Sequence, residues 1–280
     1  MRFSVLLICA AFVLLSSCLP KSDAPVGTFI RKNLVYGPYT RNRMDVYLPH
    51  NRDTTTRTVF LIHGGGWIAG DKGDWNSTAI NTLLNAGYGV VCMNYRYADG
   101  DFHHQMGDIK TALDYFDGNA GDWNVAKRKF ALMGASAGGH LSLLFGHAFD
   151  SLHRVKAVIS FVGPTDMTDT VFHQYANNYS IGYVFQQFLG ATYQANPQVY
   201  RDASPLYNSS NVPTLFMHGS QDNLVPPYQG TLMFDTLTAH NVPTDTTYFG
   251  NAGHDLFGPG SVNSTQIYSE VKQWLNLYLH

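Results

Sequence analysis

Cysteine is scarce in this 280-residue chain, which limits what can hold its fold together. The chain has three cysteines, and only Cys92 lies beyond position 18. The segment that holds the other two has the character of an export signal. We therefore expect no intramolecular disulfide in the mature protein and expect Cys92, inside the apolar run 90–93, to be an inert core thiol.

Charge is also sparse, and this excludes several kinds of partner. Only 14% of the residues are charged and the formal net charge is −2. The chain has no basic patch for nucleic acid and no acidic tail. It also has no His-Glu-x-x-His metal motif, no internal repeat and no low-complexity segment. We expect small, neutral partners, no nucleic acid and no metal.

No apolar run is long enough to span a bilayer, which takes roughly 20 apolar residues. The apolar run 3–15 follows Met1-Arg2 and ends in Leu15-Ser16-Ser17-Cys18, the pattern of a bacterial lipoprotein signal. We expect a signal peptide over 1–17, a lipidated Cys18 that anchors the protein to a membrane, and a tether over 18–27. Leu19 favours the outer membrane. An ordinary secretory signal with an incidental cysteine, or a membrane anchor, is the alternative.

The remaining residues, 28–280, are expected to form one α/β domain, because no linker-like composition divides them. Three strands separated only by turns are followed by an alternation of strands and helices, which is typical of a mostly parallel sheet with helices on both faces and an antiparallel edge. The expected strands are 28–36, 43–48, 58–62, 89–94, 129–133, 155–161, 213–218 and 245–249. The expected helices are 75–86, 104–117, 137–149, 227–240 and 262–279.

A serine stands where a strand turns directly into a helix. Gly134-Ala135-Ser136-Ala137-Gly138 follows the apolar run 130–133 and precedes the helix-like segment 139–149. A bulky residue two positions from the serine would clash in such a tight turn, so glycine is required on both sides. This is the pattern of a nucleophile elbow, which exposes the Ser136 hydroxyl at a helix N-terminus.

A glycine-rich loop follows an earlier strand. The buried run 58–62 continues directly into His63-Gly64-Gly65-Gly66-Trp67. Successive glycines leave backbone N–H groups bare and able to approach a ligand, as an oxyanion hole requires. Gly65 and Gly66, with Ala137 after the elbow serine, are the candidate oxyanion donors.

Together these two motifs resemble the α/β-hydrolase superfamily, specifically esterases similar to hormone-sensitive lipase and to bacterial feruloyl or acetyl-xylan esterases. The resemblance spans about residues 30–279 and continues through 196–197, 203–205, 213–226 and 253–255. It implies an eight-stranded α/β-hydrolase fold. One departure is segment 94–99, where Tyr97-Ala98-Asp99 stands in place of the Leu-Ala-Pro-Glu usual in lipase-like relatives, which makes the lipase branch less favoured.

A serine hydroxyl is a weak nucleophile at neutral pH and needs a base. His254 is the preferred base, because it lies in a late glycine-flanked loop after a strand. His218 ends a strand and is expected to be a buried histidine that shapes the acid loop. His140, one helical turn after Ser136, is expected to pack the helix.

The base needs an acid that fixes its tautomer. Asp222 lies in a loop after a strand, and the chain order Ser136, Asp222, His254 is the order this fold uses. Asp166 is the competitor, because it follows the preceding strand, although a helix cap is its preferred role. Asp255 is too close in sequence to reach the imidazole of His254 and is expected to orient the loop.

Other residues near the glycine loop have less specific roles. Trp67 and His63 are candidate lining residues of the substrate pocket, and for Trp67 packing beneath the loop is an equal alternative. Asp71-Lys72 is expected to form a structural turn or ion pair. Asp108 is expected to pair with Arg96 in the scaffold.

A helical insert over about 164–210, between two sheet strands, is expected to lie over the site as a lid. Nine of the 36 residues 172–207 are aromatic, a share well above the 14% of the whole chain. For any single tyrosine, packing of the lid onto the sheet is preferred, whereas one or two of the group are expected to contact substrate.

These motifs predict a serine ester hydrolase that needs no cofactor. Export favours acetyl or hydroxycinnamoyl esters on plant polysaccharide fragments as substrates. A broad short-chain carboxylesterase and a kynurenine-formamidase-like amide hydrolase remain alternatives within the same resemblance. A binding protein on this fold is a further alternative, although all three members of the triad are present. A dinucleotide-binding loop is disfavoured, because the strand ending at Asn94 lacks the ribose-binding acid.

Overall fold

The computed structural model describes residues 27–178, 182–257 and 264–280. The expected signal peptide, Cys18 and all of the tether except its last residue lie outside these ranges. Within them, eight strands form one sheet in the order β1-β2-β4-β3-β5-β6-β7-β8. The strands are β1 Phe29–Val35, β2 Arg43–Leu48, β3 Thr58–Ile62, β4 Gly89–Met93, β5 Phe130–Ala135, β6 Val155–Phe161, β7 Thr214–Gly219 and β8 Thr244–Phe249.

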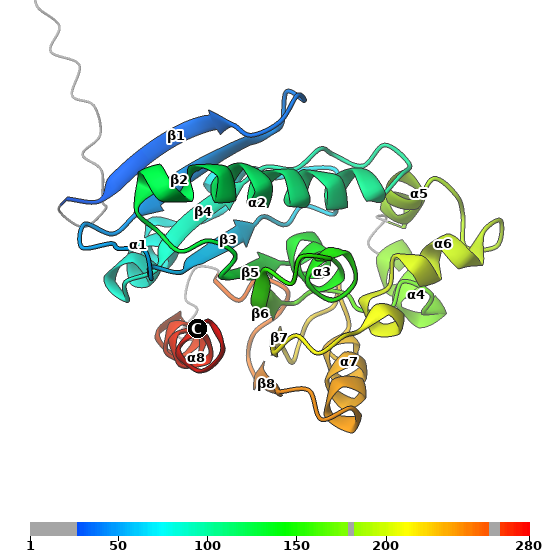
Figure 1. Ribbon diagram of the computed structural model, residues 1–280. Helices are drawn as coiled ribbons and strands as arrows, with labels where there is room; N and C mark the ends of the chain where they lie inside the picture. Colours follow the sequence, from blue (N-terminus) through cyan, green and yellow to red (C-terminus); the bar gives the residue numbers. More distant parts are fainter. Residues whose placement is uncertain (1–26, 179–181, 258–263) are drawn as a thin grey trace, which may run out of the picture.

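The sheet is antiparallel at one edge and parallel elsewhere (Figure 1). β2 pairs antiparallel with both β1 and β4, and all later pairings are parallel. The central strand β3, Thr-Val-Phe-Leu-Ile, is buried at every position, as expected for a strand covered on both faces. This topology confirms the α/β-hydrolase fold that the sequence predicts.

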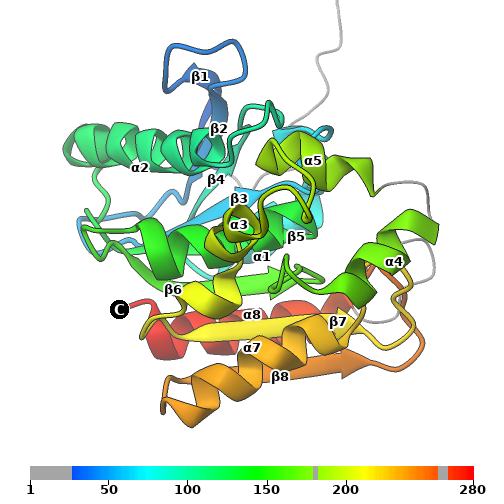
Figure 2. The same cartoon turned by 90° about the vertical axis from the view of Figure 1, so that its right-hand side faces the viewer.

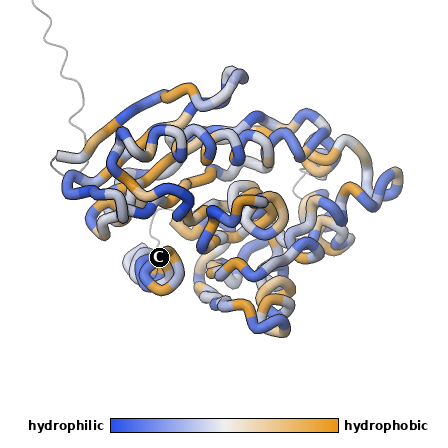
Figure 3. The backbone as a smooth tube through the Cα atoms, in the orientation of Figure 1, coloured by the Kyte–Doolittle hydropathy of each residue, from blue (hydrophilic) through white to orange (hydrophobic). Residues whose placement is uncertain are grey.

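Helices cover both faces of the sheet (Figures 1 and 2). One core cluster packs against the apolar sides of α2, α3 and α7, and a second packs against α1 and α8. Along α2, hydrophobic and hydrophilic positions alternate in the manner of an amphipathic helix (Figure 3). These helices are α1 Ser77–Asn85, α2 His103–Trp123, α3 Ala137–Leu144, α7 Tyr228–Ala239 and α8 Ser264–Tyr278.

Two helix boundaries differ from the sequence prediction by more than two residues. α2 continues six residues past the expected end at 117, because Ala120 is buried in the core and the helix ends only where Asn124 takes a left-handed conformation with φ 54°. The helix expected over 137–149 changes to a π-helical turn over Phe145–Phe149. The first two residues of the helix expected over 262–279 lie outside the described residues.

The chain between β6 and β7 forms short helices at one end of the sheet (Figure 1). This segment covers the residues expected to form the insert. Its elements are α4 Thr170–Asn178, α5 Tyr183–Leu189, α6 Pro197–Asp202 and the 3₁₀ turn η3 Pro205–Asn208. No helix in the described part of the chain combines the length and apolar character that crossing a membrane requires.

Candidate active site

The turn between β5 and α3 places Ser136 in a strained conformation. Its φ and ψ are 54° and −121°, a region that few non-glycine residues adopt. The chain reverses so tightly that a Cβ on Gly134 would lie 2.1 Å from the carbonyl oxygen of Gly138, and a Cβ on Gly138 would lie 2.1 Å from that of Ile62. Both glycines are therefore required by close backbone contact.

We expect Gly138→Ala to destabilise the protein by about 3 kcal/mol, because the added methyl group meets a backbone oxygen that cannot move aside. Gly118 is a matched control inside α2, where an added Cβ would meet nothing within 4 Å. Gly118→Ala should stabilise the helix by about 0.5–1 kcal/mol. Urea denaturation of both variants measures the difference, and similar effects in the two would show that crowding at the elbow is unimportant.

Ser136, His254 and Asp222 form a continuous chain of hydrogen bonds. Ser136 Oγ lies 2.9 Å from His254 Nε2, and His254 Nδ1 lies 2.8 Å from Asp222 Oδ2. With Nδ1 donating to the carboxylate, Nε2 is left to accept the serine proton. The structure thus brings together three residues from the ends of β5, β7 and β8 in the arrangement of a catalytic triad.

Asp222 is held as a buried carboxylate by several donors. Its Oδ1 accepts hydrogen bonds from the backbone N–H groups of Leu224 and Val225, at 2.8 and 2.9 Å, and its Oδ2 lies 3.2 Å from His218 Nε2. Burial alone would raise the pKa of Asp222, but the hydrogen bonds from His218 and His254 lower it well below the ordinary value. His218 lies where the sequence placed it, beside the acid.

The competing carboxylates have other partners. Asp166 accepts hydrogen bonds from Thr168, through both its N–H and its hydroxyl, and from Tyr207. It therefore closes the turn before α4 rather than contacting His254. Asp255 accepts from the backbone N–H of Phe257 at 2.9 Å, which orders the loop that follows the histidine.

The glycine loop places bare backbone N–H groups beside Ser136. Gly65 and Gly66 have φ values of 107° and 57°, which glycine adopts without strain. The carbonyl oxygen of Gly65 accepts from the N–H groups of Ile68 and Ala69, at 3.1 and 2.9 Å, and so ties the loop together. Within the described ranges, the N–H groups of Gly65 and Gly66 have no acceptor, so they are available to a developing oxyanion.

Trp67 both packs beneath the loop and lines a cavity. Its ring stacks on Phe188 at 4.6 Å, and its indole N–H donates to His140 Nδ1 at 3.2 Å. His140 Nε2 donates in turn to the carbonyl oxygen of Ala203 at 2.8 Å. Burial lowers the pKa of His140 to about 4, so this histidine is a neutral packing residue, as expected.

His63 lies behind the glycine loop. Its Nδ1 donates to the carbonyl oxygen of Gly64 at 2.7 Å, and its Nε2 accepts from Arg41 at 3.3 Å. The side chain is buried and lines a small cavity beneath the loop. Burial lowers the pKa of His63 to about 4, so the neutral ring fixes the direction of the Gly64 carbonyl group.

A cavity of about 460 Å³ opens directly above Ser136 and His254. Its walls come from the glycine loop and from α4 and α5, and its lining includes Phe172, Val184 and Phe185. Among the described residues, no Asp, Glu, Lys or Arg lines it. We refer to it as the apolar pocket. It suits the hydrophobic part of a ligand.

The BD-FAE family model matches residues 44–237, a range that holds the glycine loop, the elbow and Asp222. The chain belongs to the BD-FAE family. This membership and the fold confirm the expected relation to α/β-hydrolase esterases.

Curated relatives of this BD-FAE chain carry the names of esterases. It is 28% identical over 245 residues to a probable isoprenylcysteine alpha-carbonyl methylesterase of Arabidopsis thaliana, covering 81% of this chain and 58% of the relative. It is 29% identical over 262 residues to the probable carboxylic ester hydrolase LipM of Mycobacterium tuberculosis, covering 87% and 60%. The chain thus spans less than two thirds of the length of these relatives.

Solved structures share the fold of this BD-FAE chain. A truncated carbohydrate esterase from gut microbiota superposes with a TM-score of 0.73 at 22% identity, covering 89% of this chain and 99% of that one. Esterase 2 of Thermogutta terrifontis gives a TM-score of 0.70 at 18% identity, covering 90% and 95%. At these identities the likeness establishes the arrangement of strands and helices.

Arg41 of this BD-FAE chain stabilises the glycine loop, a role that the sequence analysis did not predict. Besides His63, it donates to the carbonyl oxygens of Tyr95 at 2.8 Å and Gly70 at 2.9 Å, and its guanidinium lies 3.8 Å from the centre of the Tyr97 ring. It therefore joins the glycine loop to the segment after β4. Arg41 lies in an ordinary-looking loop, and no motif marks it.

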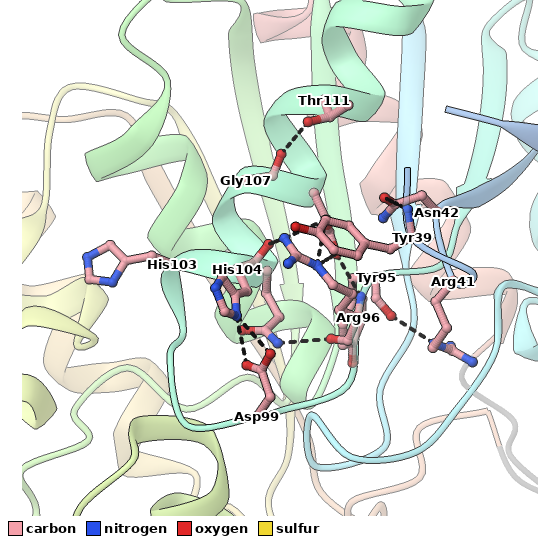
Figure 4. A network of polar contacts seen from close by, with 12 residues as sticks. Tyr39, Arg41, Asn42, Tyr95, Arg96, Asp99, His103, His104, Gly107 and Thr111 are labelled. Carbon is pink, nitrogen blue, oxygen red and sulfur yellow. Dashed lines mark hydrogen bonds and ion pairs between the residues drawn. The ribbon is translucent and has the colours of Figure 1, made fainter. Parts of the chain in front are cut away.

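Next to Arg41, the segment after β4 is fixed by a second arginine (Figure 4). Arg96 forms the expected ion pair with Asp108, at 3.0 Å, and lies over the Tyr39 ring. The expected turn at Asp71-Lys72 also forms. Asp71 accepts from the Gly73 N–H at 2.9 Å, and Lys72 pairs with Asp45 at 3.1 Å.

Proposed function

We propose that this protein is a serine carboxylic ester hydrolase and that Ser136, His254 and Asp222 are its catalytic triad. The proposal rests chiefly on the hydrogen-bond chain from Asp222 through His254 to Ser136. This hydrogen-bond chain lies at the base of the apolar pocket, beside the N–H groups of Gly65 and Gly66, which have no acceptor among the residues that the structure describes. The names of the curated relatives favour the same activity.

In the proposed reaction, Ser136 Oγ attacks the ester carbonyl carbon while its proton passes to His254 Nε2. The N–H groups of Gly65, Gly66 and Ala137 stabilise the oxyanion, and each such donor is typically worth about 10²-fold in rate. As the C–O bond to the alcohol breaks, His254 donates its proton to the leaving oxygen. Water then attacks the acyl carbon and gives a proton to His254. The bond from the acyl carbon to Ser136 Oγ breaks, His254 returns the proton to Oγ, and the carboxylic acid leaves. Asp222 stays ionised throughout.

The preferred substrates are hydroxycinnamoyl esters of polysaccharide fragments. An acetyl group would leave most of the apolar pocket of about 460 Å³ empty, whereas the ring and propenyl chain of a hydroxycinnamoyl group would fill more of it and could pack against Phe172 and Phe185. The solved relative named a carbohydrate esterase supports a sugar as the alcohol. Acetyl sugar esters are the second choice within the same class.

A substrate panel tests this function. Purified protein is assayed on p-nitrophenyl acetate, p-nitrophenyl octanoate, methyl ferulate, an acetylated xylo-oligosaccharide and N-formylkynurenine. We expect methyl ferulate to give the highest kcat/KM among the non-activated substrates. Preference for the octanoate ester would point to a broad carboxylesterase, and turnover of the formamide alone would point to an amide hydrolase. Hydrolysis of none would contradict the proposal.

We also propose that the protein is exported and anchored to the outer membrane through a lipid on Cys18. When it is produced in a bacterium fed radiolabelled palmitate, the protein should acquire label, and Cys18→Ser should lose it and leave the membrane fraction. Cys92→Ser is the control, because Cys92 is buried in β4 and should not affect labelling. Label that persists in Cys18→Ser would contradict the anchor.

A further inference from the structure

A second cavity meets the apolar pocket at the proposed triad. It has a volume of about 450 Å³ and shares with the apolar pocket three lining residues, Gly65, Ser136 and His254. We call it the acidic pocket. An ester whose carbonyl carbon lies at Ser136 must place its acyl half on one side of the serine and its alcohol half on the other. The two cavities are therefore suited to the two halves of one substrate.

The two cavities differ in charge. The acidic pocket has two exposed acidic residues, Asp74 and Asp255, in a lining that is otherwise largely apolar. The apolar pocket has no Asp, Glu, Lys or Arg among its described lining residues. No Lys or Arg of the described chain lines the acidic pocket. Within the same ranges, neither carboxylate has an ion-pair partner within 4.0 Å, so no direct ion pair offsets their negative charge.

Both carboxylates are fixed in place and still have capacity to accept hydrogen bonds. Asp74 Oδ2 accepts from the backbone N–H of Asp71 at 2.8 Å, and Asp255 Oδ1 accepts from that of Phe257 at 2.9 Å. The remaining oxygens, Asp74 Oδ1 and Asp255 Oδ2, accept no hydrogen bond from the described residues. Ionised carboxylates only accept hydrogen bonds, so a ligand that fits them must supply donors.

We propose that the acidic pocket is the alcohol subsite, and that Asp74 and Asp255 select alcohols that are neutral and rich in hydroxyl groups while rejecting anionic ones. This inference rests on the proposed esterase function. Hydroxyl groups of a neutral sugar can donate to the free carboxylate oxygens. A uronic acid or phosphorylated alcohol would bring a further negative charge beside Asp74 and Asp255, in a cavity with no Lys or Arg among its described lining residues, which is unfavourable.

A matched pair of substrates measures this selectivity. Both are feruloyl esters at the 2-hydroxyl, one of methyl glucopyranoside and one of methyl glucopyranosiduronic acid, which differ only by the carboxylate at C6. At low ionic strength we expect the wild-type kcat/KM to favour the neutral ester by about tenfold or more. The preference should shrink as salt is added, because the carboxylates are exposed and screened.

The variants Asp74→Asn and Asp255→Asn, alone and combined, test the two residues. Each should lower the ratio of kcat/KM between the neutral and anionic esters, and the double variant should bring it close to one. A ratio cancels any loss that both substrates share, so it reports charge selection separately from catalytic damage. Asp235→Asn is the control, because Asp235 is exposed on α7, away from both cavities, and should keep the wild-type ratio.

The outcomes separate this inference from the proposed function. Equal hydrolysis of the two esters by the wild-type protein, or an unchanged ratio in the double variant, would overturn the charge selection while leaving the esterase function intact. Hydrolysis of neither ester, together with activity on p-nitrophenyl acetate, would show that a sugar does not occupy the acidic pocket. Inactivity on every ester would refute the proposed function itself.

Discussion

Ser136→Ala is expected to lower kcat for p-nitrophenyl acetate by about 10⁵-fold or more, leaving only the weak catalysis that the oxyanion donors provide. The variant removes the attacking oxygen, and no other hydroxyl group hydrogen-bonds to His254 among the described residues. It should also remove the initial burst of p-nitrophenol, because no acyl-enzyme can form.

The fold should survive this substitution, since alanine occupies the same backbone position and removes only one partly exposed oxygen. The thermal unfolding midpoint therefore serves as the control measurement, and it should change little. Ser151→Ala is a matched variant at an exposed serine in the turn after the π-helical segment Phe145–Phe149 and should keep full activity. Turnover by Ser136→Ala above one part in a hundred of the wild-type rate would rule out Ser136 as the nucleophile.

Asp222→Asn is expected to lower kcat by about 10⁴-fold with a smaller effect on KM. An amide cannot stabilise the imidazolium form of His254, and its NH₂ group can favour the wrong tautomer of the ring. Steady-state kinetics on p-nitrophenyl acetate measure the loss. Asp166→Asn is the matched control at the competing acid, and we expect it to change kcat by less than about threefold. If Asp166→Asn lowered kcat more than Asp222→Asn, the acid of the triad would be Asp166.

Asp222→Asn should also change how the free energy of unfolding depends on pH. The folded-state pKa of Asp222 is lowered from the ordinary value of 3.8, so its ionised form stabilises the native state above that value. This contribution is lost as the pH falls through the lower folded-state pKa. The difference in free energy of unfolding between wild type and Asp222→Asn should therefore be constant above about pH 5 and shrink in more acidic solution. A difference that does not depend on pH would contradict the assigned pKa shift.

Local sequence patterns predicted the elbow and the glycine loop because both depend on short-range backbone constraints. The close contact of Gly134 with Gly138 spans four residues, and any side chain larger than hydrogen breaks it. The approach of His254 and Asp222 to Ser136 was predictable from the strand order, because parallel strands bring their carboxyl ends to one edge of the sheet.

The supporting contacts were beyond prediction because they depend on long-range packing. Arg41 reaches His63 and Tyr95 from the turn between β1 and β2, and nothing in its neighbourhood distinguishes it from a surface arginine. The burial of His63 behind the loop depends on its stacking with Tyr95, at 4.3 Å. The charge difference between the two cavities likewise arises only when the loops holding Asp74 and Asp255 meet.

The helix that begins beside Ser136 is fully enclosed, since all eight residues of α3 are buried. Segments of this kind exchange their amide hydrogens only when the whole domain opens, whereas peripheral segments with exposed aromatics, such as α4 and α5, can open on their own. Ser136 is therefore expected to keep its position for as long as the domain stays folded. We expect the helices that shape the apolar pocket to open more readily than α3, so that substitutions there alter substrate preference without loss of the reactive centre.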